Sequence, residues 1–346
     1  MNSSKEEKEL KTKEGSTINN YIINNSKFKS ILKKNKSSFI ENFELLNFIG
    51  TGSESEVYKA KIIRYNKIVA LKMISVKKDE EKNDEIKISK KLKNQNIINF
   101  YLSNVIKKNK VHCIMMEYAK YGNLRDFENN FLEKNNLSES FLCFITSQIL
   151  NGLKYIHSCK ITHYDLKPQN IIIDDYLNVK IIDFSVSLDY SKINSNKIKL
   201  PFRGTSFYMS PEVIRNDTIN IKDLNKIDLY SLGVILYNLA FGSYPFKLNQ
   251  KDIKKYDKIY KKIMKDLIIN NIFNYYSPHF IDFIKKLLEK DINKRININE
   301  ALNDYWIKGA EILFNEKEKI NNAGIFLSYL VTDHIKNFYD YIHKIF

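Results

Sequence analysis

The spacing of apolar residues changes near residue 120, and this change limits the folds that the chain can adopt. From Phe43 onward, short apolar runs alternate with polar residues and turns, as in "FELLNFIGTGSESEVYKAKII", "KIVALKMISV" and "NKVHCIMMEYA", a pattern typical of β-strands. Between them, "DEIKISKKLK" has helical spacing. After Gly122, "ESFLCFITSQILNGLKYIHS" keeps its apolar residues on one face over about five turns, which predicts a long helix. A β-rich part followed by a helix-rich part predicts an α+β fold with two lobes, and "MEYAKYGN" is the expected hinge.

The composition favours a folded intracellular protein. A chain of 346 residues suffices for one large domain or two lobes. Cys113, Cys143 and Cys159 form no close pair in the sequence, so we expect reduced thiols. The first residues, "MNSSKEEKEL", lack the apolar core of a signal peptide, and "LGVILYNLAF" is too short to span a bilayer. A soluble cytoplasmic protein is expected, and a nuclear location is also compatible.

The formal net charge of +16 has two interpretations. A basic surface can bind nucleic acid or an anionic membrane, whereas a Lys-rich surface can also be merely solvated. The basic residues are spread along the whole chain, without a dense Arg block or a nucleic-acid-binding motif. We therefore favour the solvated surface and expect no nucleic-acid partner and no membrane partner.

Both ends of the chain differ from its middle. Residues 1–40 are rich in Lys, Ser, Asn and Glu and predict a disordered polar tail. Residues 308–346 predict a helical extension with one apolar face. Its apolar residues recur at spacings of four or three: Leu327, Val331, Ile335, Phe338, Ile342 and Ile345. This helix could pack on the chain's own helical lobe or dock a partner or a second copy, and the sequence leaves both interpretations open.

Several short motifs follow one another at defined spacings. "IGTGSESEV" places Gly50 and Gly52 in a strand-turn-strand setting where a backbone can approach phosphate closely, although an ordinary hairpin turn is the better explanation of this motif taken alone. Lys72 ends the apolar run "VALK", and Glu85 opens the helical segment. The polar loop "ITHYDLKPQNIIID" comes next, and Asp183 in "IIDFS" lies 13 residues beyond Asn170. Further motifs are "GTSFYMSPE", "DLYSLGVILY" and "KDINKR".

In this order and spacing, the motifs resemble a eukaryotic protein kinase domain over residues 43–307. The resemblance implies a bilobal fold with a β-rich N-lobe, residues 43–118, a helical C-lobe, residues 119–307, and ATP bound between them. It also implies transfer of the γ-phosphate of ATP to Ser or Thr hydroxyls of protein substrates, with Mg²⁺ as cofactor.

The resemblance gives particular residues a chemical role. Asp165 resembles the base that accepts the substrate's hydroxyl proton, and Lys167 the lysine that contacts the γ-phosphate. Lys72 resembles the lysine on the α- and β-phosphates, and Glu85 the glutamate that holds it. Asn170 and Asp183 resemble the ligands of Mg²⁺, a cation that prefers oxygen. The implied nucleotide-binding residues are Gly50, Thr51, Gly52, Ser53, Val57, Ala70, Lys72, Glu85, Met116 as gatekeeper, Glu117, Ala119 and Asn170.

Four further residues resemble parts of the family's scaffold. Glu212 and Arg295 resemble a buried ion pair. Asp228 resembles the residue that braces the backbone of the catalytic loop. Thr205 resembles the threonine that hydrogen-bonds the catalytic Asp and Lys.

Ser55 stands where the family has the third glycine of its G-x-G-x-x-G loop, and the sequence departs from the family pattern at four further places. Tyr164 replaces the arginine of His-Arg-Asp, which in the family pairs with a phosphate on the activation segment, and a neutral phenol cannot form that pair. Ser185 replaces the glycine of Asp-Phe-Gly, and Ser89 replaces a large apolar residue. The connection from Lys72 to Glu85 is short, so the regulatory helix is expected to lack its first turn.

These departures leave two interpretations open, neutral divergence and altered regulation. They predict an enzyme that is active without phosphorylation of its activation segment, Asp183 to Glu212. Four cations of this segment, Lys192, Lys197, Lys199 and Arg203, are expected to tie it to nothing rigid. A pseudokinase scaffold that binds partners or nucleotide without catalysis is the alternative function.

Overall fold

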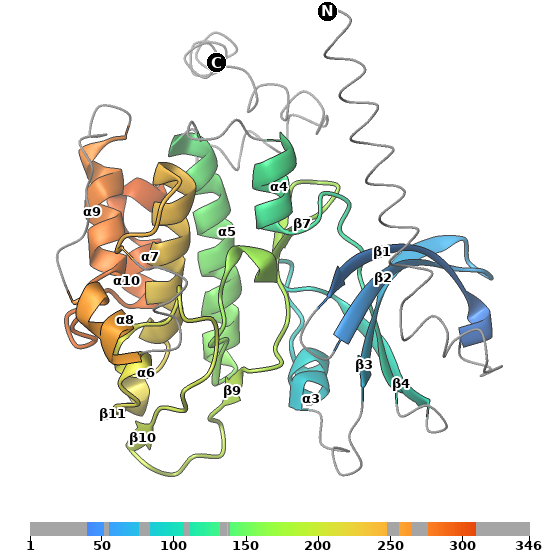
Figure 1. Cartoon of the computed structure of the whole chain (residues 1–346), viewed down its shortest axis with the longest axis horizontal. Coiled ribbons are helices and arrows are strands. Elements are labelled where there is room, and N and C mark those ends of the chain that lie inside the picture. The colour runs from blue at the N-terminus through green and yellow to red at the C-terminus, as the bar shows by residue number, and fades with distance from the viewer. Residues whose placement is uncertain are drawn as a thin grey trace, which may run out of the picture. The chain divides into compact units, whose positions relative to one another are not determined.

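The computed structural model describes residues 40–51, 55–75, 84–106, 111–131, 137, 139–247, 256–264 and 276–308. The chain divides into two compact units (Figure 1). The first comprises Met1–Lys90 and Ile98–Tyr118, and the second comprises Lys91–Ile97 and Ala119–Phe346. The polar tail before residue 40 and the amphipathic pattern from Leu327 to Ile345 lie outside the described residues.

The first unit is built on a five-stranded antiparallel sheet in the order β1-β2-β3-β5-β4. Its strands are β1 (Phe43–Thr51), β2 (Ser55–Ile62), β3 (Lys67–Ser75), β4 (Phe100–Ile106) and β5 (Val111–Met116), preceded by a 3₁₀ turn, Ile40–Asn42. Pairing of β1 with β2 confirms the predicted hairpin. The helix α3 (Asp84–Lys91) follows β3 in the chain.

Side-chain alternation divides this sheet into two faces. One face carries the buried apolar cluster that includes Tyr58, Val69, Leu71, Met73 and Cys113. The residues that alternate with these along a strand, such as Ala70 between Val69 and Leu71, therefore point to the opposite face. Lys72 has this second orientation and lies inside β3, which runs on to Ser75, and not at the strand's end as its sequence motif indicated.

The second unit is mainly helical. Its helices are α4 (Leu124–Phe131), α5 (Glu139–Ser158), α6 (Pro211–Ile214), α7 (Lys226–Phe241), α8 (Tyr256–Ile263), α9 (Pro278–Leu287) and α10 (Ile298–Leu302). The bounds of α5 are those predicted from its periodicity. Short antiparallel pairs join β6 (Ile161–Thr162) to β9 (Leu188–Asp189), β7 (Ile171–Ile173) to β8 (Val179–Ile181), and β10 (Lys197–Lys199) to β11 (Thr218–Asn220). None of the helices in the described ranges is long and apolar enough to cross a membrane.

The helix α7 lies at the centre of the second unit and is buried on all sides. It packs against α5 and α9. A Cβ at Gly233 would lie 2.9 Å from the Cβ of Leu287, so glycine allows the close crossing of α7 and α9. The helix ends at Gly242, whose φ of 64° is the left-handed conformation that glycine adopts without strain.

The segment Lys91–Ile97 belongs to the second unit, although the motif order placed it in the N-lobe. The amide of Asn96 donates to Oε1 of Gln148 at 3.2 Å and to the carbonyl oxygen of Val179 at 3.0 Å. Ile97 forms a parallel bridge with Ile181. These long-range contacts attach the segment to α5 and β8, and local periodicity contains no signal for them.

Candidate active site

A buried ion pair lies in the first unit. The Nζ of Lys72 is 2.6 Å from Oε1 of Glu85, and both residues are less than 10% exposed. The sheet positions the lysine, and the helix α3 positions the glutamate. An ammonium held in this way is a fixed positive charge suited to binding phosphate oxygens.

The strand register gathers several predicted nucleotide-binding residues beside this pair. Lys72 of β3 pairs directly with Val57 of β2, and Ala70 pairs with Met116 of β5. Because paired residues point to the same side of a sheet, these four side chains share one face. Gly50 of β1 pairs with Val57 and extends this set to the next strand.

Thr51, Glu117 and Ala119 are further predicted nucleotide-binding residues that the structure describes. Thr51 ends β1 opposite Glu56, whereas Gly52 and Ser53 lie outside the described residues. The side chain of Glu117 accepts a hydrogen bond from the Asn99 amide at 2.9 Å. Ala119 is the first residue of the second unit after the hinge.

The catalytic loop of the second unit brings three predicted residues together. The Nζ of Lys167 is 2.6 Å from Oδ2 of Asp165. The amide of Asn170 donates to the carbonyl oxygen of Asp165 at 2.8 Å and to its Oδ2 at 3.3 Å. These contacts fix the carboxylate and leave its other oxygen, Oδ1, buried and without a hydrogen-bond partner among the described residues. The Asp165 side chain keeps 12% of its surface exposed, so this fixed carboxylate remains within reach of a bound hydroxyl.

Thr205 reaches this loop from the activation segment. Its Oγ1 accepts a hydrogen bond from the Lys167 ammonium at 2.9 Å, which confirms one of the two predicted contacts. The other, to Asp165, is not formed in the described part of the chain.

Asp228 of α7 holds the backbone of the catalytic loop, as predicted. Its carboxylate accepts the amides of His163 and Tyr164, each at 2.9 Å, and a hydrogen bond from Nε2 of His157 at 2.8 Å. Burial alone would raise the pKa of Asp228, but the hydrogen bond from His157, the two histidine charges and the Tyr164 amide together lower it. A buried ionised carboxylate thus stabilises Tyr164 in the left-handed conformation, with φ of 71°.

Asp183 follows β8 and is linked to the catalytic loop through its neighbour, because the amide of Ile182 donates to the carbonyl of Asn170 at 3.0 Å. The backbone of Asp183 is also left-handed, with φ of 65°. Phe184 is buried, with its ring 5.3 Å from that of His163. Ser185, in the usual glycine position, is not among the residues with positive φ, so its Cβ causes no backbone strain in this conformation.

The donor set fits Mg²⁺ bound together with phosphates. The described residues contain no cluster of three or more His, Cys, Asp and Glu suited to holding a metal ion alone. Magnesium, however, commonly takes one or two protein oxygens and completes its shell with substrate phosphates and water. The carboxylate of Asp183 would be one such ligand. Because the amide nitrogen of Asn170 is engaged with Asp165, its side-chain oxygen would be the other.

Two residues of the site have a geometry that the motifs did not reveal. Gly204 has a φ of 104°, and a Cβ there would lie 2.7 Å from the carbonyl oxygen of Tyr164. In the sequence, the only indication of this close approach was a glycine between Arg203 and Thr205 in "FRGTSF". Arg203 was expected to tie the activation segment to nothing rigid, and this expectation is wrong, because its guanidinium lies 5.1 Å from the ring centroid of Tyr164 in the catalytic loop.

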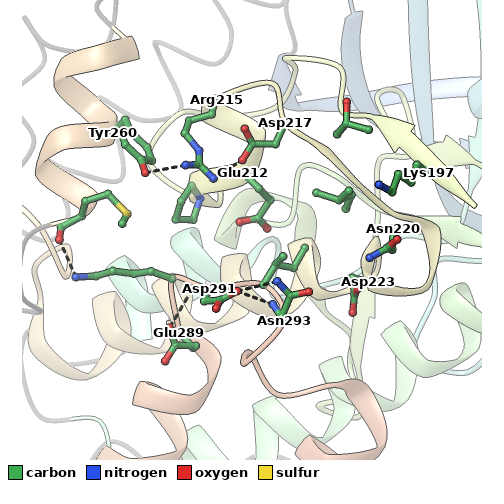
Figure 2. A pocket seen from close by; sticks show the side chains of 16 residues that line it. Lys197, Glu212, Arg215, Asp217, Asn220, Asp223, Tyr260, Glu289, Asp291 and Asn293 are labelled. Carbon is green, nitrogen blue, oxygen red and sulfur yellow. Dashed lines mark hydrogen bonds and ion pairs between the residues drawn. The ribbon is translucent and has the colours of Figure 1, made fainter.

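A separate pocket of about 620 Å³ lies in the second unit (Figure 2). Its lining includes Glu212, and it contains none of the residues predicted for catalysis or nucleotide binding. The polar groups that line it are largely paired with one another. Arg215 forms an ion pair with Asp217 and donates to the hydroxyl of Tyr260 at 3.1 Å, as Figure 2 shows. We therefore assign the chemistry to the catalytic loop and not to this pocket.

The Glu212–Arg295 pair behind this pocket confirms another scaffold prediction. The guanidinium donates from Nη1 and Nη2 to the two carboxylate oxygens, at 2.7 and 3.0 Å. Arg295 is only 1% exposed. The pair joins the end of the activation segment to the loop that precedes α10.

The buried lysine–glutamate pair on a β-sheet and the braced Asp-Lys-Asn loop define the class of phosphotransferases that share the kinase fold. The family model of the protein kinase domain matches residues 43–307, and the chain belongs to this family. This membership, with the five-stranded sheet and the helical second unit, confirms the predicted α+β kinase fold.

Several curated proteins are similar to the chain. The MAP kinase kinase MKK1/SSP32 of Saccharomyces cerevisiae is 30% identical over 282 residues, which cover 78% of this chain and 54% of that protein. The serine/threonine-protein kinase pakH of Dictyostelium discoideum is 32% identical over 275 residues, with 78% and 50% covered. The serine/threonine-protein kinase dst2 of the same organism is 32% identical over 288 residues, with 82% and 24% covered. The chain therefore spans about half the length of the first two relatives and about a quarter of the third.

Proposed function

We propose that the chain is an ATP-dependent protein serine/threonine kinase. The observation that carries this proposal is the carboxylate of Asp165, which Lys167 and Asn170 fix in place and which stays 12% exposed. The ion pair of Lys72 and Glu85 supports it, because the charge on which nucleotide binding depends in this family is present and held. The names of the relatives, which include serine/threonine-protein kinases, support hydroxyl groups of protein substrates as acceptors.

Each residue has a defined part in this proposal. Lys72 neutralises the α- and β-phosphates of ATP, and Glu85 keeps its ammonium in place. Asn170 and Asp183 would hold Mg²⁺, which would supply charge neutralisation to the phosphates. Asp165 orients the attacking hydroxyl and takes its proton on the carboxylate.

Lys167 has a second task in this mechanism. It holds Oδ2 of Asp165 and the hydroxyl of Thr205 at the same time, which fixes its charge beside the base. In this proposal that charge contacts the γ-phosphate. Phosphoryl transfer depends mainly on positioning and charge stabilisation, which these fixed groups provide.

We further propose that this activity needs no phosphate on the activation segment. Backbone pairing supports the proposal, because β9 pairs with β6 and β10 pairs with β11 in the unmodified chain. Phosphatase-treated protein is therefore expected to keep most of its activity.

The test is transfer of labelled phosphate from ATP to a generic protein substrate in the presence of Mg²⁺. Replacement of the base in Asp165→Asn is expected to lower the rate by about 10²–10⁴-fold, and Lys72→Met is expected to abolish transfer. The matched control is Asp175→Asn, which makes the same change at an exposed residue and is expected to retain activity. Wild-type protein that binds ATP without transferring phosphate would instead establish the pseudokinase alternative.

A further inference from the structure

Tyr164 occupies an unusual place for an aromatic residue. It lies in the catalytic loop next to Asp165 and is only 3% exposed. Its hydroxyl donates a hydrogen bond to the carbonyl oxygen of Pro201 at 3.2 Å. Its ring lies against the guanidinium of Arg203, 5.1 Å from the ring centroid. The activation segment has a first limb, which contains Ser187, and a final limb, Pro201–Thr205. A single side chain of the catalytic loop thus contacts two residues of the final limb.

Arg203 extends this contact to the first limb of the same segment. Its Nη2 donates to the carbonyl oxygen of Ser187 at 3.2 Å. The hydroxyl of Ser187 in turn donates to the carbonyl oxygen of His163 at 3.0 Å. The two limbs are therefore joined to each other and to consecutive residues, His163 and Tyr164, of the catalytic loop.

The middle of the segment is attached to the second unit by backbone hydrogen bonds. Lys197–Lys199 form β10 and pair with Thr218–Asn220. The amide of Leu200 donates to the carbonyl of Asp217 at 2.9 Å, and the Leu200 side chain is fully buried. Pro201 thus follows a fixed residue, and the hydrogen bond from Tyr164 continues the attachment toward the catalytic loop.

Only four positions separate Pro201 from Thr205, which contacts the catalytic loop. Gly204 lies so close to the carbonyl of Tyr164 that a Cβ would be 2.7 Å from it. Its neighbour Thr205 accepts the hydrogen bond from Lys167 at 2.9 Å, and Lys167 holds Asp165. A shift of Pro201 away from Tyr164 therefore moves Gly204 and Thr205 relative to the base.

The contact of Tyr164 with Pro201 and Arg203 also contains no group that becomes an anion near neutral pH. Burial raises the pKa of Tyr164 well above its usual range, although the charge of Arg203 opposes this effect. The phenol therefore stays a neutral hydrogen-bond donor wherever the protein is folded. A phosphate in the same role would bring a charge of about −1.5 to −2 and would need an arginine in the catalytic loop.

We propose that Tyr164 is a positioning residue for phosphoryl transfer, which fixes the Pro201–Thr205 limb through its hydroxyl and its ring and so takes over the role of a phosphate–arginine contact. This proposal rests on the kinase function proposed above. It assigns the absence of a phosphate requirement to one side chain, and it includes Arg203 as the partner that links the two limbs.

Three variants separate the parts of this contact. Tyr164→Phe removes only the hydrogen bond to Pro201, and Tyr164→Leu removes the hydrogen bond and the ring. Arg203→Met removes the charge over the ring and the link to Ser187. Tyr176→Phe is the matched control, because Tyr176 is 75% exposed in the same unit.

The first measurement is steady-state kinetics on phosphatase-treated protein. Tyr164→Leu is expected to lower kcat/KM for a peptide substrate by about tenfold or more, and Tyr164→Phe by a few fold, because one lost hydrogen bond and one lost cation–ring contact each change an equilibrium by about three- to tenfold. The KM for ATP is expected to change by less than about twofold, since Lys72 and Glu85 are untouched. A merely structural defect would instead impair ATP binding and peptide phosphorylation together.

The second measurement is amide hydrogen exchange, which needs no catalytic activity. Residues 197–206 are expected to exchange faster in Tyr164→Leu and Arg203→Met, while α5 and α7 keep their protection. If the wild type transfers no phosphate but these exchange changes occur, the kinase function fails, and what survives is the attachment of residues 201–205 by Tyr164 without a part in phosphoryl transfer. If Tyr164→Leu leaves both the exchange of residues 197–206 and the peptide kcat/KM at the level of Tyr176→Phe, the proposal is wrong.

Discussion

Replacement of Arg295 by methionine is expected to destabilise the second unit strongly. Its guanidinium binds both oxygens of Glu212 and donates from Nε to the carbonyl of Glu289 at 2.8 Å and from Nη1 to the carbonyl of Lys226 at 3.1 Å. It also lies 4.8 Å from the ring centroid of Tyr230. Methionine keeps much of the side-chain volume but leaves the Glu212 carboxylate buried without its partner.

The magnitude follows from this burial. Arg295 is 1% exposed and Glu212 is 3% exposed, so neither group gains water when its partner is removed. Loss of one partner from such a pair costs about 3–5 kcal/mol. For a unit of this size, each 1 kcal/mol lowers Tm by about 2–4 °C, so a decrease of roughly 10 °C is expected.

The fluorescence of the single tryptophan offers a local assay. Trp306 is buried in the second unit, with its ring 4.9 Å from that of Phe280 and 5.1 Å from that of Phe283. Its emission during heating or urea titration therefore follows the unit that contains Arg295.

Two comparison variants make the experiment decisive. In Lys286→Met the lost ion pairs are to Asp282 and Asp304, but the lysine side chain is 45% exposed, so a cost of only about 0–1 kcal/mol is expected. The double variant Arg295→Met with Glu212→Gln is expected to lose less stability than the sum of the two single variants, because no unpaired charge remains. An equal loss of stability in Arg295→Met and Lys286→Met would refute the reasoning.

Three further predictions concern other described residues. Gly204→Ala is expected to lower peptide kcat/KM by about tenfold or more in steady-state kinetics, because its Cβ would meet the carbonyl of Tyr164 at 2.7 Å with φ at 104°. The pKa of Asp228 is lowered, so the stability that its ionised form contributes is present above about pH 4 and is lost as pH falls through the folded pKa. Asp228→Asn is expected to weaken this loss of stability at acid pH, as measured by tryptophan fluorescence. Burial raises the pKa of the Cys113 thiol to about 12, so iodoacetamide at pH 8 is expected to label half-buried Cys159 and spare Cys113, as measured by mass spectrometry.

The sequence predicted those features that depend on local pattern or on a single strong motif. The periodicity of α5 gave its bounds because a long buried helix needs apolar residues at every turn. The motif order also predicted the pairing of Glu212 with Arg295 and the brace formed by Asp228, although 83 and 65 residues separate the partners. These two long-range contacts were implied by the resemblance to the kinase family and not by local pattern.

The features that escaped prediction depend on contacts between segments that are distant in sequence. The side chain of Asn96 reaches β8 across 83 residues, and nothing in its neighbourhood indicates this. Arg203 looked like one more surface cation of a charged segment, yet its guanidinium packs on an aromatic ring 39 positions earlier. The presence of Tyr164 was noticed as a missing arginine, whereas its own bonding capacity became visible only with Pro201 in place. Periodicity describes which residues are apolar, and it carries no information about which carbonyl a phenol will meet.

The contact of Tyr164 with Pro201 and Arg203 consists of protein atoms alone and is complete when the chain has folded. The contact forms without phosphorylation of the segment by a second enzyme, and a phosphatase cannot remove it. If the proposed independence of phosphorylation holds, a cell would have to limit the activity through the amount of protein, its lifetime, or a partner that covers its substrate-facing surface. Tyr in place of one arginine would then move control away from a rapid covalent switch and toward slower processes.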